Sequence, residues 1–493
     1  MPSTATTAHP PLPDDAAPAQ LRAALEVQRA GFLASQPEPL SVRKDRLGRA
    51  VAMLVDHAEA FCAALDEDFG GRSRQQSMLT DIVPSLSALK HARKHLDAWA
   101  RDERRRPLFP LGLLGGSARV SYQPKGVVGV IAPWNYPVGM VMVPLAGVLA
   151  AGNRAMLKPS EFTPRVSALF ARLVPGLFAG DELAVVTGGA AVGQAFSALP
   201  FDHLIFTGAT GIGRQIMRAA AANLTPVTLE LGGKSPVIIG QSADLARTAE
   251  RLVIGKMMNA GQTCLAPDYL LVPRNRELAL IEELKGAVAR QYPDLLAGND
   301  YTAIVSDRHF ARLTAHVEDA RAKGAEVIVV NPASRSPATA PAPASGRKMP
   351  LQILRNVTGE MSVMQEEIFG PLLPVVPVED TRAAVAYVNA RDRPLALYYF
   401  GSDRAEEQQV IGGTTSGGVT VNDVIFHVAM DDLPFGGIGC SGMGNYHGRD
   451  GFKTFSHARA IYRQSPLDVA RLAGLKPPYG AWADKSIARD LKK

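Results

Sequence analysis

Two side chains in the middle of the sequence could together carry out nucleophilic chemistry. Glu230 lies at the end of a strand-like alternation over 227–231 and precedes the glycine pair 232–233, and Cys264 stands in the small-residue loop 259–264. A thiolate attacks carbonyl carbon readily, and a carboxylate can act as general base. Free cysteines are also among the most buried residues, so packing is the plain alternative for Cys264. Its Gly-Gln-Thr-Cys setting packs like neither a core strand nor a core helix, which favours the nucleophile.

An asparagine follows a predicted buried strand further upstream. The β-branched run 127–131 leads to Asn135, which is flanked by Pro133 and Pro137. Two prolines restrict the backbone on either side, so the Asn135 amide is held in place rather than free. Asparagine is also a common turn residue, and this alternative stays open on the residues alone.

Two later strands end in groups that suit a dinucleotide. A short strand over 155–157 leads to Lys158 and Glu161, and the strand 203–206 opens into the glycine-rich turn 207–213. A cation and a carboxylate at the end of a parallel strand can bind ribose hydroxyls, although a surface ion pair is the simpler alternative. The backbone N–H groups of a glycine-rich turn can face a pyrophosphate. The glycine spacing is not the ordinary G-x-G-x-x-G, so the turn alone is weak support.

The segments 230–236 (Glu-Leu-Gly-Gly-Lys-Ser-Pro) and 261–264 (Gly-Gln-Thr-Cys) resemble the paired motifs of the aldehyde dehydrogenase superfamily. The resemblance implies that Cys264 is the nucleophile, that Glu230 is the general base and that Asn135 donates to the oxyanion. It also implies a nicotinamide cofactor bound by Trp134, Lys158, Glu161, Gly208, Thr210, Gly213, Leu231, Glu367 and Phe369. Glu161 would repel a 2′-phosphate, so NAD is expected, with NADP as the alternative. No metal is expected.

The closing segment 433–448 resembles the class 3 branch of this superfamily and, with 427–429, bacterial coniferyl aldehyde dehydrogenases. This implies NAD(P)-dependent oxidation of an aromatic or cinnamyl aldehyde, such as coniferaldehyde, through a cysteine thiohemiacetal and thioester. The alternative is a broad medium-chain aliphatic aldehyde dehydrogenase. CoA-acylating relatives usually lack the general-base glutamate, a crystallin-like protein would be expected to have lost a catalytic residue, and a cysteine hydrolase would need a histidine beside Cys264.

An apolar and partly aromatic substrate pocket is expected from four residues, namely Tyr136, Phe426, His427 and His447. The same four side chains could equally be packing residues. The class 3 resemblance further implies a homodimer.

The composition excludes several other classes of protein. The net charge of +6 is small for 493 residues, and the basic cluster 101–106 contains two acidic residues, so no nucleic-acid partner is expected. Three scattered cysteines favour a reducing compartment. The longest apolar run, 138–151, contains a proline and is shorter than the roughly 20 residues that span a bilayer. Without a secretory signal at the amino terminus, a cytoplasmic protein is expected.

A chain of this length is expected to form two or three domains of an α/β fold. Helical periodicity runs from residue 21 to about 99, buried strands follow, and 118–122 alternates like an edge strand. The resemblance implies a Rossmann-like parallel-sheet cofactor domain, an α/β catalytic domain and a small β bridging or oligomerisation element. The expected division is a flexible tail (1–20), the NAD-binding domain (21–105 and 125–231), the catalytic domain (232–442), the bridging element (106–124 and 443–475) and a carboxyl-terminal tail (476–493), with an exposed insertion at 331–348.

Overall fold

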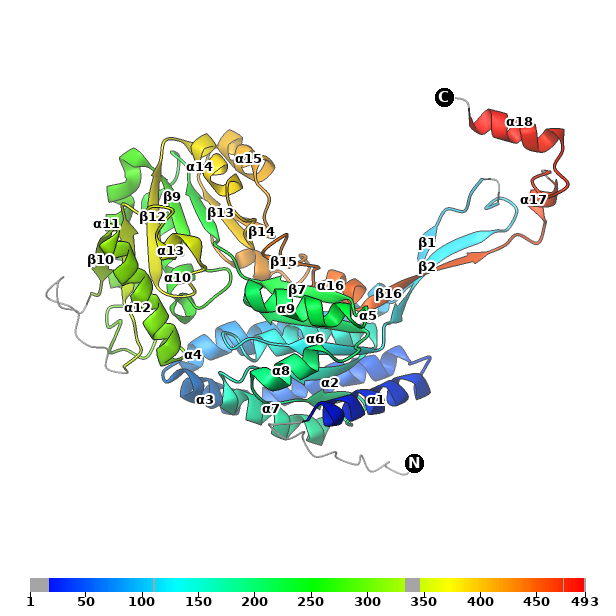
Figure 1. Cartoon of the computed structure of the whole chain (residues 1–493), viewed down its shortest axis with the longest axis horizontal. Coiled ribbons are helices and arrows are strands. Elements are labelled where there is room, and N and C mark those ends of the chain that lie inside the picture. Colours follow the sequence, from blue (N-terminus) through cyan, green and yellow to red (C-terminus); the bar gives the residue numbers. More distant parts are fainter. Residues whose placement is uncertain (1–16, 110, 333–345, 473, 492–493) are drawn as a thin grey trace.

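The computed structural model describes residues 17–109, 111–332, 346–472 and 474–491. These residues form two α/β lobes and a β-stranded arm that projects away from both (Figure 1). Each lobe is built on a predominantly parallel sheet, whereas the arm is antiparallel. The mixed α/β architecture confirms the predicted fold class.

The first lobe contains a six-stranded sheet whose strands run in the spatial order β15 (Gly442–Met443), β7 (Val227–Leu231), β6 (His203–Gly208), β3 (Val127–Ile131), β4 (Arg154–Lys158) and β5 (Leu183–Val185). All neighbours are parallel except β15, which is antiparallel to β7. Every residue of β3 and β4 is buried, as expected for strands covered on both faces. The carboxyl ends of β3, β4, β6 and β7 therefore meet at one edge, where the predicted site residues follow them.

Helices cover both faces of this sheet (Figure 1). Those that connect the strands are α6 (Gly139–Ala151), α7 (Pro164–Leu177), α8 (Ala190–Ser197) and α9 (Thr210–Ala221). The amino-terminal ones are α1 (Pro18–Ala34), α2 (Leu40–Asp56), α3 (Ala58–Phe69), α4 (Arg74–Ser77), the π-helical turn η1 (Met78–Ile82) and α5 (Val83–Trp99). The expectation of helices up to residue 99 is thereby confirmed.

The second lobe contains a seven-stranded sheet in the order β10 (Glu326–Val330), β11 (Leu351–Arg355), β12 (Leu372–Val378), β9 (Tyr269–Pro273), β8 (Pro236–Ile239), β13 (Ala396–Phe400) and β14 (Gly418–Val421). Only β10 is antiparallel to its neighbour. Its helices are α10 (Leu245–Met257), α11 (Glu277–Gln291), α12 (Asp307–Ala322), α13 (Ser362–Gln365), α14 (Thr381–Asn389) and α15 (Arg404–Gly413).

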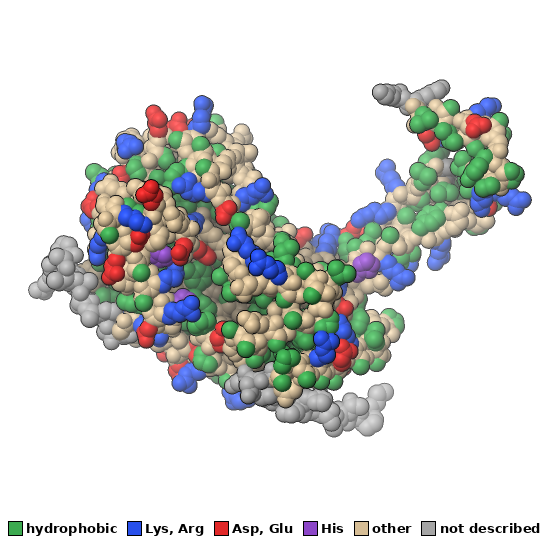
Figure 2. All heavy atoms as spheres, in the orientation of Figure 1, with side chains coloured by type: hydrophobic (Ala, Val, Ile, Leu, Met, Phe, Trp, Pro, Cys, Tyr) green, Lys and Arg blue, Asp and Glu red, His purple; other side chains and the backbone are tan. Residues whose placement is uncertain are grey.

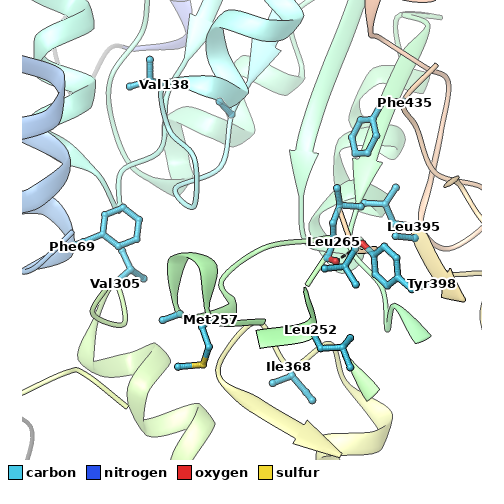
Figure 3. Packing of buried hydrophobic residues seen from close by; sticks show 14 of the residues in the cluster. Phe69, Val138, Leu252, Met257, Leu265, Val305, Ile368, Leu395, Tyr398 and Phe435 are labelled. Atoms are coloured by element: carbon cyan, nitrogen blue, oxygen red, sulfur yellow. Dashed lines mark hydrogen bonds between the residues drawn. The ribbon is translucent and has the colours of Figure 1, made fainter. Parts of the chain in front are cut away.

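The core of this lobe reaches up to the predicted nucleophile. Leu252 and Met257 of α10 are buried near Leu265, the residue that follows Cys264 (Figure 3). The hydroxyl of buried Tyr398 donates to the carbonyl oxygen of Leu265 at 2.6 Å. The cysteine loop is therefore anchored to β13 through a buried hydrogen bond and to the core through apolar packing.

The arm is a three-stranded sheet in which β2 (Ser117–Pro124) lies between β1 (Glu103–Arg105) and β16 (Ser456–Arg463). The expectation of an edge strand at 118–122 is wrong, because β16 arrives from the far end of the chain to pair with its open side. Of the segment 443–475, only part lies in the arm. Met443 pairs with Leu229 in the first lobe, and α16 (Gly448–Thr454) packs against α6.

The structure changes what was expected of the two chain termini, both of which were predicted to be tails. Most of the predicted flexible tail, residues 1–16, and most of the predicted insertion, 333–345, lie outside the described residues. Residues 18–20 belong to the first turn of α1, because Pro18 is tolerated at the start of a helix and Leu21 is already buried. The carboxyl-terminal tail contains α18 (Ala481–Asp490), which follows α17 (Val469–Leu472). No described helix is long and apolar enough to cross a membrane.

Candidate active site

The predicted nucleophile lies in a loop with an unusual backbone. After α10, the turn 258–261 places Asn259, Ala260 and Gly261 at positive φ angles of 50°, 54° and 72°. Two consecutive residues with side chains rarely adopt this conformation, so surrounding contacts must impose it. Buried Gln262 supplies them: its Nε2 donates to Asn259 O at 2.9 Å and Ala303 O at 3.1 Å, and its Oε1 accepts from Val305 N at 2.9 Å. The loop is held from both sides.

Asn135 joins this loop from the first lobe. Its amide Nδ2 donates to Gln262 O at 3.2 Å, and its own carbonyl oxygen accepts from Asn259 Nδ2 at 2.9 Å. The next residue makes a second link, because the Tyr136 hydroxyl and Thr263 Oγ1 are 2.7 Å apart. The structure thus brings the predicted oxyanion donor beside the Cys264 loop, although the two segments are more than 120 residues apart.

Glu230 lies in β7 between β6 and β15, and only 2% of it is exposed. Neither carboxylate oxygen has a hydrogen-bond partner among the described residues. Burial without a compensating charge raises the pKa of Glu230 well above its ordinary value. Burial also raises the pKa of the Cys264 thiol to about 12, and the nearby carboxylates of Glu367 and Glu230 add to that rise. In the free protein the Cys264 thiol is therefore neutral at pH 7, and Glu230 holds its proton more tightly than an ordinary carboxyl group does.

Glu367 and Phe369 reach the same site from the loop that follows α13. A methyl group on Gly232 would lie 1.9 Å from Glu367 Oε2, so the carboxylate is packed directly on that glycine. Burial, followed by the charge of Asp268, raises the pKa of Glu367 to about 8. Phe369, at a φ of 49°, contacts Trp134 edge to face with ring centroids 5.3 Å apart. Two predicted cofactor residues of the second lobe thus meet the first lobe.

Lys234 fixes this loop. Its ammonium group forms an ion pair with Asp268 and donates to Val363 O at 2.7 Å and Glu366 O at 2.9 Å. Asp268 in turn accepts from Ile368 N at 3.0 Å. A lysine of the first motif therefore positions the segment that carries Glu367.

The remaining predicted cofactor residues lie along the carboxyl edge of the six-stranded sheet. Lys158 is buried, and its Nζ lies 3.4 Å from the more exposed carboxylate of Glu161. Helix α9 begins at Thr210, and no described side chain caps it, so the N–H groups of Thr210 and Gly211 at its start can face an anion, whereas Ile212 N donates to Ala209 O. A methyl group on Gly213 would lie 2.5 Å from Leu231 Cδ2, so Gly213 allows α9 to pack closely on β7. A cation, a free helix terminus and a tight glycine contact suit a dinucleotide.

Two further contacts involve the remaining predicted cofactor-binding residues, Thr210 and Gly208. The Thr210 hydroxyl donates to Cys440 O at 3.2 Å, so Thr210 connects α9 to the closing motif. At Gly208 a methyl group would lie 2.6 Å from the ring of Phe206, so the turn before α9 also requires glycine. Both residues thus shape the turn through contacts within the protein.

The four predicted substrate-pocket residues differ in burial and in their contacts. Tyr136 is buried and bonded to Thr263, whereas 54% of Phe426 is exposed. His427 Nδ1 lies 2.8 Å from Thr420 Oγ1, and burial lowers the pKa of His427 to about 4. Burial lowers the pKa of His447 to about 4 as well. Both histidines are therefore neutral at pH 7.

His427 and His447 both pack on one phenylalanine. Phe435 lies 6.3 Å from the His427 ring and 5.0 Å from the His447 ring, measured between centroids. His447 also borders a small pocket between α5, α6 and the closing loop, together with Trp99, Asp431 and Tyr446. Both histidines thus pack on Phe435, and their predicted role in substrate binding stays a prediction.

Sequence reasoning missed several residues that shape the site. Asn259 and Gln262 stand inside the cysteine motif, where their polar side chains in a small-residue loop were a usable signal. Tyr446 is fully buried, with a pKa raised by burial and by the nearby Glu230 and Cys264. Arg72 and Asp81, which contact the Asn135 segment, carried no local pattern at all.

The sequence matches the aldehyde dehydrogenase family over residues 8–461. It is 51% identical over 484 residues to a probable coniferyl aldehyde dehydrogenase of Caulobacter vibrioides, covering 98% of this chain and 99% of the relative. It is also 51% identical over 462 residues to a coniferyl aldehyde dehydrogenase of a Pseudomonas species, covering 94% of each chain.

Solved structures agree with these matches. The substrate-bound AldH of Staphylococcus aureus superposes with a TM-score of 0.85 at 35% identity, covering 95% of this chain and 99% of that one. A Mycobacterium tuberculosis aldehyde dehydrogenase in complex with NAD+ gives a TM-score of 0.79 at 28% identity, covering 92% of each chain.

Proposed function

Because the chain belongs to the aldehyde dehydrogenase family and is an NAD(P)-dependent aldehyde-oxidising enzyme, we propose that it converts an aromatic aldehyde of the coniferaldehyde type into its acid with NAD. The observation that carries the proposal is the convergence of Cys264, Glu230 and the Asn135 amide on one buried site. The two relatives at 51% identity, both named for coniferyl aldehyde, support the substrate class.

In the proposed first step, the Cys264 sulfur attacks the aldehyde carbon. The resting thiol has a high pKa, so the thiolate must form at the moment of attack, with the proton passing to a base. The new oxyanion accepts hydrogen bonds from the Asn135 amide and the Cys264 backbone N–H; loss of such a donor typically lowers the rate by about 100 to 1000-fold. A bound NAD, held by the residues named below, would supply the hydride acceptor that this adduct needs.

In the proposed second step, Glu230 promotes hydrolysis of the thioester left on Cys264. A carboxylate buried without partners is strongly basic once ionised, which suits it to take a proton from water. The water oxygen adds to the acyl carbon, the thiolate leaves and the acid is released. Because burial raises the pKa of Glu230, ionisation of this carboxyl group, which must precede its action as a base, is favoured by a higher pH than an ordinary carboxyl group needs.

The cofactor would be held at both ends. Lys158 and Glu161 suit the adenosine ribose, the free first turn of α9 suits the pyrophosphate, and Glu367 suits the nicotinamide ribose. Glu367 Oε1 is buried and has no partner in the described part of the chain, as expected for an acceptor that awaits a hydroxyl. The Glu161 carboxylate would repel a 2′-phosphate, so we propose NAD over NADP.

The test is initial NADH formation at 340 nm with coniferaldehyde, benzaldehyde and hexanal, each with NAD and with NADP. At least about tenfold higher kcat/KM for coniferaldehyde than for hexanal, roughly 1.4 kcal/mol of discrimination, supports the proposed substrate class. Equal or better oxidation of hexanal would assign a broad aliphatic enzyme instead. Thioester accumulation that only CoA relieves would assign a CoA-acylating enzyme.

We further propose a cytoplasmic homodimer with an NAD-binding domain, a catalytic domain and a bridging element formed by β1, β2 and β16. Apolar side chains gather on the outer end of the arm (Figure 2), where Leu472, Tyr479, Trp482 and Leu491 are 70 to 77% exposed. Such a patch on an extended arm suits a second copy of the chain. Sedimentation of a Trp482→Glu variant tests the dimer: the variant should dissociate at concentrations where the unmodified protein does not. The free cysteines suit a reducing compartment.

A further inference from the structure

An ion pair is buried completely behind the Asn135 segment. Arg72 follows α3, Asp81 stands in the π-helical turn η1, and neither side chain has any exposed surface. Arg72 Nη2 donates to Asp81 Oδ2 at 2.6 Å and to Thr80 Oγ1 at 3.1 Å. Burying both charges is costly, and apolar side chains of similar volume often stabilise a core as well. A contribution to the stability of the folded protein is therefore a weak explanation for why charged residues occupy these two buried positions.

Both members of the pair contact the main chain around Asn135. Arg72 Nη1 donates to the Asn135 carbonyl oxygen at 3.0 Å. Asp81 Oδ1 accepts from Val138 N at 3.1 Å and from Gly139 N at 2.8 Å. The pair thus forms hydrogen bonds with the main chain on both sides of Tyr136 and Pro137. Hydrogen bonds to charged groups are stronger than those between neutral groups.

Two aromatic rings contact the guanidinium group through cation–π interactions. Its carbon lies 4.8 Å from the Phe69 ring centroid and 5.2 Å from the Tyr136 ring centroid. A lysine at position 72 would keep the charge but lose the planar fork and the stacking. The geometry at Arg72 therefore depends on a guanidinium rather than on a positive charge alone.

We propose that Arg72 and Asp81 act as a positioning pair that aims the Asn135 amide at the oxyanion. This inference rests on the proposed function of Asn135. The Asn135 carbonyl accepts from Arg72 and from Asn259, so its peptide plane has two fixed donors and the side chain leaves the backbone in a set direction. An oxyanion donor must lie within about 2.7 to 3.1 Å of the developing charge. A small rotation of the Asn135 peptide would therefore weaken the hydrogen bond from its amide to the oxyanion.

The test separates oxyanion stabilisation from thiol reactivity in the full-length protein. Acylation of Cys264 by p-nitrophenyl acetate passes through an oxyanion, whereas alkylation by iodoacetamide displaces iodide from a saturated carbon and forms none. In Arg72→Lys and Asp81→Asn we expect acylation to fall about 10 to 100-fold, less than full loss of a donor. The alkylation rate should stay within about twofold, and kcat for aldehyde should fall more than KM changes.

A double-mutant cycle with Asn135→Ala shows whether the pair acts through that amide. If it does, Arg72→Lys in the Asn135→Ala background causes no further loss of acylation rate, because the group that it positions is gone. Additive losses, or parallel losses of acylation and alkylation, would overturn the proposal and leave a purely structural role. If Arg72→Lys does not fold by circular dichroism, Asp81→Asn, which keeps an acceptor oxygen, carries the same cycle.

Arg74→Lys is the matched control, because Arg74 lies two residues away and pairs with Glu59 on the surface. It should leave both rates unchanged. Failure of the proposed function gives a different pattern: the unmodified protein would then form no NADH with any aldehyde, whatever the acylation cycle reports.

Discussion

The Glu367 carboxylate lies where a side chain on Gly232 would have to be. A methyl group built on Gly232 comes within 1.9 Å of Oε2 and 2.4 Å of the carboxyl carbon. The two residues belong to different motifs, one following Glu230 in the first lobe and the other reaching over from the second. This contact places Glu367 beside Cys264. The charge of Glu367 raises the pKa of the Cys264 thiol more than the charge of Glu230 does.

Replacement of Gly232 by alanine should therefore displace Glu367. We expect KM for NAD to rise about tenfold or more, since the carboxylate proposed to bind the nicotinamide ribose is forced out of place. Gly233→Ala is the matched control, because its methyl group would meet Leu395 N at an ordinary 3.5 Å. Steady-state kinetics with varied NAD measures both. Equal KM values for the two variants would show that Glu367 does not bind the cofactor.

Alkylation of Cys264 in the free protein should accelerate steadily with pH. Since the pKa of the thiol is raised to about 12, the thiolate fraction and the alkylation rate should keep growing between pH 7 and pH 9, by up to about tenfold per unit and by less where Glu367 ionises. Iodoacetamide inactivation rates in the absence of cofactor test this. A plateau below pH 8 would mean that the free enzyme stabilises its thiolate.

The Glu367→Gln variant should differ from the unmodified protein only at alkaline pH. With a pKa of about 8, Glu367 is mostly neutral at pH 7 and charged at pH 9, so its charge suppresses the thiolate only above pH 8. We expect similar inactivation rates at pH 7 and faster inactivation of the variant at pH 9. Faster inactivation of the variant already at pH 6 would contradict the raised pKa.

The raised pKa of Glu367 also predicts how stability depends on pH. Its carboxyl titrates near 4.5 in the unfolded chain and near 8 in the folded one, so the folded protein binds the extra proton between these values. Stability must then fall as pH rises through this window, by at most about 1.4 kcal/mol per pH unit from this group. Urea unfolding should show the unmodified protein losing stability relative to Glu367→Gln from pH 5 to pH 8. A constant difference would refute the shift.

Replacement of Glu230 by glutamine should slow hydrolysis of the thioester more than its formation. We expect a burst of about one NADH per active site, followed by a steady-state rate about 100 to 10,000-fold lower, because the proposed base for water is lost. Rapid mixing with 340 nm detection resolves the burst. Glu366→Gln is the control, since the Glu366 side chain is 65% exposed and should behave normally. A variant with the normal steady-state rate would remove Glu230 from the mechanism.

The local elements of the site could be predicted from the sequence. Strands β3, β4, β6 and β7 are short apolar runs that end at recognisable breakers, and the turn before α9 requires glycine for reasons that lie within a few residues. Because parallel strands end at one edge, the strand pattern by itself places Asn135, Lys158 and Glu230 together. Family resemblance supplied their proposed roles.

What surrounds these residues was decided by the tertiary structure alone. Strand β2 became central because β16 returned from more than 300 residues away, and His427 and His447 became packing neighbours of Phe435. The buried pair of Arg72 and Asp81 carries no periodicity or motif, since its partners are main-chain atoms some 60 residues distant. The sequence alone thus determined which residues are proposed to carry the chemistry, because motif and strand pattern are local. The fold decided what positions them, because those contacts join segments that no local pattern connects.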